Sequence, residues 1–122
     1  MTAAERRAHL DEGRRLFNRG EYWSAHEALE TVWRSIIRTG EPEAVAEGLV
    51  WQGFIQAAAA LLHLERGNQH GVKTVGRAAL AKLDGPQHER VEFEMAHFRA
   101  QLARALTGEG DPPKLEYRTT DG

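Results

Sequence analysis

Apolar positions recur at intervals of three and four residues through most of the chain, which is the spacing of one face of an α-helix. Glycine and proline interrupt this pattern at a few points, and the stretches between them are predicted to be helical. The predicted helices cover about residues 3–19, 21–38, 43–66, 69–83 and 87–106. No alternation long enough to build a sheet occurs, so the sequence predicts an all-α, compact bundle of five to six helices.

The predicted helix at 43–66 is apolar almost all the way round, and four alanines follow one another at 57–60. A helix of this kind is typical of the middle of a bundle, so we place it at the centre. Its uncharged stretch, 48–64, falls at the short edge of the roughly 17–25 residues that a membrane span needs. A buried core helix is the favoured interpretation.

A length of 122 residues fits one domain. We expect a single helical-bundle domain over residues 1–107. The last segment, 108–122, opens on glycines and prolines and is expected to be a polar tail, extended or mobile.

Composition excludes several classes of function. The chain has no cysteine, which excludes disulfide frameworks, thiolate metal sites and cysteine nucleophiles. The net charge is −2 and no region is strongly basic, so binding to nucleic acid is not predicted. The first residues are polar and lead into no apolar signal run. We therefore expect a cytoplasmic protein without a membrane partner.

Two polar patches interrupt the apolar faces of the second and third predicted helices. On the second helix His26 falls inside the apolar arc and Glu30 at its edge, four residues apart, so their side chains can touch. On the third helix Gln52, Gln56 and His63 fall within a sector of about 40°. Because buried polar groups need partners, we predict that the two patches face each other.

Three interpretations of these patches remain open. The first is a structural polar network that fixes the helix register, with Trp33 filling the core beside it. The second is a pocket for a small molecule or a divalent metal, with His26 and Glu30 as ligands and His63 as a further donor. The third is an acid/base site in which Glu30 orients His26.

A single His–Glu pair is a weak metal signal, since di-iron bundles present several glutamates and two Glu-x-x-His pairs. No nucleophilic serine or cysteine motif accompanies the pair. We therefore expect a non-catalytic binding or interaction module, with a metal-dependent or acid/base enzyme at the same place as the alternative.

Four further residues carry expectations. Gly71 and Gly76 are expected to let neighbouring helices approach closely. Trp23 or Tyr22, if exposed, would mark a surface for a protein partner or for a second copy of the chain.

Several motifs recur in an order that resembles a known family. The run from Phe17 to Trp23 leads into His26-x-x-x-Glu30-x-x-Trp33, and a Gln-Ala-Ala helix and a Gly-Asn turn follow. This pattern resembles the bacterial and archaeal family catalogued as domain of unknown function 309. The resemblance covers about residues 16–83, and residues 112–115 resemble that family's usual C-terminal end. It implies a compact helical bundle and no particular activity.

Overall fold

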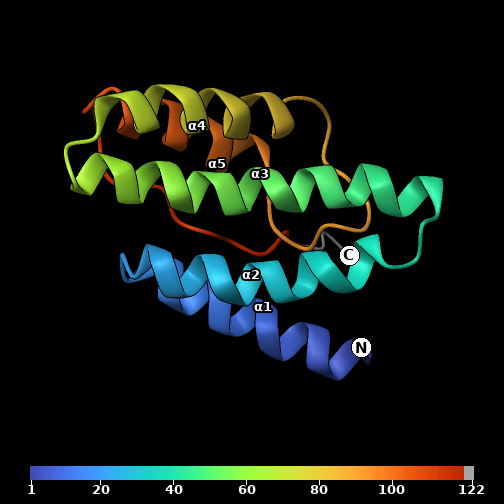
Figure 1. Ribbon diagram of the computed structural model, residues 1–122. Helices are drawn as coiled ribbons and strands as arrows, with labels where there is room; N and C mark the ends of the chain where they lie inside the picture. The colour runs from blue at the N-terminus through green and yellow to red at the C-terminus, as the bar shows by residue number, and fades with distance from the viewer. Residues whose placement is uncertain (120–122) are drawn as a thin grey trace.

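The structure, a computed structural model, describes residues 1–119. Five helices follow one another in that range (Figure 1): α1 (Ala3–Asn18), α2 (Tyr22–Ile37), α3 (Pro42–Glu65), α4 (Gln69–Lys82) and α5 (Ala96–Leu106). Within these residues the one strand-like contact is an isolated bridge between Phe93 and Tyr117. The predicted all-α bundle is therefore confirmed.

The helix ends follow from local chemistry. At the start of α1 the Thr2 hydroxyl accepts a hydrogen bond from the Glu5 backbone N–H, and the Glu5 carboxylate accepts one from the Thr2 N–H, both at 3.1 Å. The turns after α1, α2 and α3 each contain a glycine with positive φ: Gly20 at 81°, Gly40 at 67° and Gly67 at 69°. Such short turns make consecutive helices antiparallel neighbours.

Helix α3 lies between α2 and α4, with α1 against α2 and α5 behind the α3–α4 pair (Figure 1). Pro42–Glu65 is the one helix in residues 1–119 that is long and apolar enough to cross a membrane, but 61% of its most apolar window is buried. It is placed as the core helix of a soluble protein would be, and the predicted central position is confirmed.

An aromatic cluster joins elements that are far apart in the sequence. Phe54 of α3 lies 5.0 Å from Phe98 of α5 and 5.7 Å from Phe93, measured between ring centroids. Phe98 in turn lies 5.6 Å from Phe17 of α1. All four rings are buried, so this cluster forms the centre of the core and fixes how the two ends of the chain meet α3.

The predicted helix over 87–106 is wrong in its first half, because α5 begins only at Ala96. Residues 87–95 run in an irregular, partly extended path in which Val91, Phe93 and Met95 are buried and the residues between them are not. This is the period of two of extended backbone. Val91 and Met95 are also four residues apart, which is a helical spacing, and the sequence pattern therefore predicted a helix there.

The side chain of Gln87 supplies hydrogen bonds that a helix would otherwise have made. Its amide nitrogen donates to the carbonyls of Val91 at 3.2 Å and Phe93 at 2.8 Å. Its amide oxygen accepts from the Met95 N–H at 2.9 Å. One side chain therefore satisfies the backbone of the non-helical segment.

The described part of the C-terminal segment, 108–119, lies against the bundle. Leu115 is fully buried, and the Asn18 side chain accepts from its N–H at 2.7 Å and donates to its carbonyl at 3.0 Å. Farther on, the Arg118 N–H donates to the Glu92 carbonyl at 2.8 Å. The segment was expected to be extended or mobile, and its described part is extended and packed against the bundle. Residues 120–122 lie outside the described range.

Candidate interaction face

The predicted contact between His26 and Glu30 is present in α2. The His26 Nε2 lies 2.7 Å from Glu30 Oε1, and each side chain keeps 23% of its surface exposed. Arg34, one turn farther on, lies 2.6 Å from the other carboxylate oxygen of Glu30. The three side chains form a ladder along the surface of the helix, with the carboxylate shared between its two neighbours.

The second imidazole nitrogen of His26 has a different environment. Its Nδ1 is buried and has no hydrogen-bond partner among residues 1–119. One ring nitrogen of His26 therefore contacts Glu30, and the other is covered by the protein.

Trp23 stacks on the His26 ring, with centroids 5.5 Å apart and planes inclined by 19°. The indole is 60% exposed, whereas its neighbour Tyr22 is buried at 6% and lies edge-on to Phe17. Of the two aromatic residues considered as surface markers, Trp23 is the exposed one, and Tyr22 belongs to the core.

Gly48 of α3 lies at the contact with the end of α2. A Cβ built on Gly48 would lie 3.1 Å from Cγ2 of Ile37 and 3.6 Å from Nε1 of Trp33. The Trp33 indole is half-buried at this crossing. Trp33, predicted from the sequence to lie beside the His–Glu pair, therefore packs against the central helix at a point where Gly48 allows close approach.

The two predicted polar patches do not meet, which corrects the sequence-based expectation. Gln56 accepts a hydrogen bond from the Lys82 ammonium of α4 at 2.9 Å. The His63 Nδ1 lies 3.1 Å from the Asn68 amide nitrogen, and the His63 ring covers Gly71, whose added Cβ would be 2.5 Å from the ring. Both side chains turn toward α4 rather than α2, because α3 is flanked by α4 as well as by α2.

Gln52, the remaining member of the predicted set, is half-buried on α3. No hydrogen bond joins it, Gln56 or His63 to the His26–Glu30 pair within the part of the chain that the structure describes. In the same residues there is no group of three His, Cys, Asp or Glu side chains placed to hold a metal. Metal binding at His26 and Glu30 stays a prediction from sequence.

Sequence reasoning missed the most buried charge. Glu47 of α3 is 4% exposed, and its Oε2 accepts from the Trp51 indole N–H at 3.1 Å and from Arg6 of α1 at 3.0 Å. Arg6 also donates two hydrogen bonds of 2.8 Å to the Glu92 carboxylate. These hydrogen bonds raise the pKa of Arg6 above its usual value. Glu47 and Trp51 stand four residues apart, a spacing that could have signalled the pair.

Four of the large apolar side chains that remain exposed lie on α2 and α3: Trp23 (60%), Val45 (56%), Leu49 (49%) and Ile37 (42%). On α2, positions 23, 26, 30, 33 and 37 fall in a sector of about 80°, and on α3 positions 45, 49, 52, 56 and 63 fall in a sector of about 60°. Ile37 of α2 contacts α3 at Gly48, which lies between Val45 and Leu49 in the sequence. We call this surface, made by Trp23, Ile37, Val45 and Leu49, the α2–α3 face.

Comparison with known proteins does not assign an activity to this chain. Residues 10–75 match the family described as Domain of unknown function (DUF309). An uncharacterized protein of Aquifex aeolicus (strain VF5) is 34% identical over 111 residues, which cover 88% of this chain and 31% of that protein. The chain thus spans about a third of the length of this curated relative. No solved structure matches the chain. The family match covers more than half of the 122 residues, and the chain therefore belongs to the DUF309 family.

Proposed function

We propose that this chain is a non-catalytic interaction module and that its binding surface is the α2–α3 face. The observation that carries the proposal is the exposure of Ile37, Val45 and Leu49 around the α2–α3 crossing at Gly48, with Trp23 exposed at the other end of α2. Single exposed apolar residues are ordinary, but a group of them on one face marks an interaction site. The occupant we propose is a second copy of the same face.

The arrangement along α2 supports a second copy. Trp23 and Ile37 lie at opposite ends of the helix, about 21 Å apart at 1.5 Å per residue. In a twofold antiparallel contact the Trp23 of each copy would reach the Ile37 and Leu49 end of the other. A surface with apolar groups at both ends is complementary to itself in this arrangement.

The charges of α2 also favour an antiparallel contact between two copies. Glu27 and Glu30 lie in its first half, whereas Arg34 lies in its second half and Arg38 directly follows the last residue, Ile37. Turned antiparallel, the acidic half of one helix would face the basic half of the other. Opposite charges at the rim favour this orientation over the parallel one, in which like charges would meet.

The His26–Glu30 pair supports binding over catalysis. Its geometry suits a fixed contact, since Nε2 is bonded and Nδ1 is covered. In the proposed complex the pair would hold Trp23 in place through the stacked imidazole. A rigid aromatic side chain loses little freedom on binding, which makes it an effective anchor.

We also propose that the protein acts in the cytoplasm. The absence of cysteine supports this location, because a chain in a reducing compartment has no use for disulfides. Fractionation of cells that express the tagged protein should place it with the cytosolic marker, and recovery with a membrane or secreted fraction would contradict the proposal.

The test of self-association compares Leu49→Glu with Ala81→Glu by size-exclusion chromatography with light scattering. Both positions are exposed on helices, but Ala81 lies on α4, away from the α2–α3 face. We expect the unchanged protein and Ala81→Glu to run as dimers at about 100 μM, and Leu49→Glu to run as a monomer, because a buried unpaired carboxylate is costly. A monomeric unchanged protein, or a dimeric Leu49→Glu, would overturn the proposal.

A further inference from the structure

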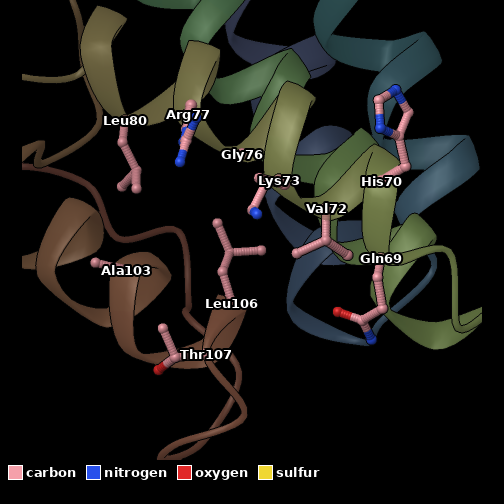
Figure 2. Close-up of a pocket in the computed structure, with 10 residues that line it drawn as sticks. All are labelled: Gln69, His70, Val72, Lys73, Gly76, Arg77, Leu80, Ala103, Leu106 and Thr107. Carbon is pink, nitrogen blue, oxygen red and sulfur yellow. The ribbon is translucent and has the colours of Figure 1, made fainter.

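A hollow lies between α4 and α5, on other helices than the α2–α3 face (Figure 2). Its volume is about 540 Å³, within the range of sites that hold small molecules. Its floor is apolar and is made by Val72, Gly76, Leu80, Ala103 and Leu106. The hollow is large enough, and apolar enough, to take the hydrocarbon part of a ligand.

Small residues let the two helices form this floor. A Cβ added to Gly76 of α4 would lie 2.8 Å from Cδ1 of Leu106, so glycine permits the leucine of α5 to reach the surface of α4. Ala103 leaves room one turn earlier on α5. The close packing expected of Gly76 therefore shapes one wall of the hollow.

The rim on the α4 side is basic. Lys73 and Arg77 are exposed, stand four residues apart and line the hollow, with His70 one turn before them. In Figure 2 the Lys73 and Leu106 side chains extend into the space between the helices, whereas the His70 ring lies farther out and is turned away. The cationic groups thus adjoin the apolar floor.

These charges are unbalanced. No carboxylate lines the hollow, and within residues 1–119 the Lys73 and Arg77 side chains have neither an ion pair nor a hydrogen-bond partner. Like charges at this spacing on a helix repel each other. An anion between them would relieve the repulsion, and a guanidinium can bind a carboxylate through two parallel hydrogen bonds.

We infer that the α4–α5 hollow binds a small amphipathic carboxylate. The carboxylate would lie between Lys73 and Arg77, and the apolar tail would cover Leu80 and Leu106. The inference does not depend on self-association, because the α2–α3 face is built from other helices.

Octanoate is a suitable probe because it joins one carboxylate to a seven-carbon tail. We expect saturable binding by calorimetry, with amide shifts in the ¹⁵N spectrum confined to α4, α5 and the segments next to them. 1-Octanol lacks the charge and acetate lacks the tail, so both should bind at least tenfold more weakly. Equal binding of octanol, or shifts spread over the whole bundle, would overturn the inference.

The matched variants are Lys73→Gln combined with Arg77→Gln, and Arg19→Gln as a control. All three residues are exposed, and Arg19 lies at the end of α1, outside the hollow. The double variant should bind octanoate at least tenfold more weakly, whereas Arg19→Gln should bind it as the unchanged protein does. Circular dichroism checks that each variant is folded, and undiminished binding by a folded double variant would refute the site.

Discussion

Glu47 shows how one residue can connect distant parts of the chain. Its carboxylate meets the Arg6 guanidinium from α1 and the Trp51 indole from its own helix, and Arg6 extends the contact to Glu92 before α5. A buried carboxylate without partners would be costly, but here two donors satisfy it. The hydrogen bonds join α1, α3 and the extended segment in a single network.

Removing this carboxylate should destabilise the protein more than removing a neighbour on the surface. Glu47→Ala leaves the Trp51 N–H without a partner and should lower the free energy of unfolding by about 2–4 kcal/mol. Glu43→Ala, one turn earlier, breaks only an exposed ion pair with Arg90 and should cost less than about 1 kcal/mol. Urea unfolding followed by circular dichroism measures both, and equal losses would contradict the assigned role of Glu47.

Two tyrosines should make the protein sensitive to alkali. Burial raises the pKa of Tyr22, and burial together with the hydrogen bond to Asp11 raises the pKa of Tyr117. Both hydroxyls are therefore harder to ionise in the folded protein than in the unfolded chain, where the pKa is about 10. Their contribution to stability is complete below pH 10 and is lost as the pH rises toward the folded values.

We expect the free energy of unfolding to fall above pH 10 by up to about 1.4 kcal/mol per pH unit for each tyrosine. A Tyr22→Phe, Tyr117→Phe double variant should lose less stability between pH 9 and pH 11. Urea midpoints at these two pH values give the comparison. An equal decline in both proteins would assign the alkaline loss to other groups.

At the scale of secondary structure, the junction between α3 and α4 is built from two side chains and a glycine. Asn68 caps α4 by accepting from the Gly71 N–H at 3.1 Å, and its amide lies 3.1 Å from His63. The His63 ring fills the space above Gly71. The histidine is thus part of a helix–helix junction rather than of a site shared with α2.

Gly71→Ala tests this junction. Alanine is normally better than glycine in a helix by about 1 kcal/mol, but here the new methyl group would lie 2.5 Å from the imidazole. We expect a net loss of about 1–3 kcal/mol in the free energy of unfolding. In a His63→Ala background the same substitution should be neutral or stabilising, because the ring is gone. If the cost persists in that background, the ring is not its cause.

At the scale of the whole molecule, the C-terminal segment closes the bundle. Leu115 enters the core, while Asn18 at the end of α1 holds its backbone from both sides. The same segment pairs with residues 92–94 through backbone hydrogen bonds. Helix α1, residues 115–118 and the extended segment before α5 are therefore joined to one another.

Leu115→Ala should lower the free energy of unfolding by about 2–4 kcal/mol, because it opens a cavity in the core. Thr119→Ala, in the same segment but exposed, should change it by no more than about 0.5 kcal/mol. Thermal and urea unfolding compare the two. A negligible loss in Leu115→Ala would mean that the segment adds little to the stability of the bundle.

The elements that depend on local chemistry could be predicted from the amino-acid sequence. Helical periodicity and glycine stops located α1 to α4, and the apolar character of α3 on almost every side predicted its central place. The His26–Glu30 contact also followed from sequence, because a spacing of four residues within one helix brings side chains together whatever surrounds them.

Which elements face one another could not be predicted in this way, because it depends on how the helices pack. Helical projection placed Gln56 and His63 on one stripe of α3, but the stripe alone did not say that α4 would supply their partners. Likewise, Val91 and Met95 fit both a helix and an extended chain, and their contacts in the core selected the extended form. Periodicity fixes the direction of a side chain from its own helix axis, whereas its neighbour depends on how the helices are packed.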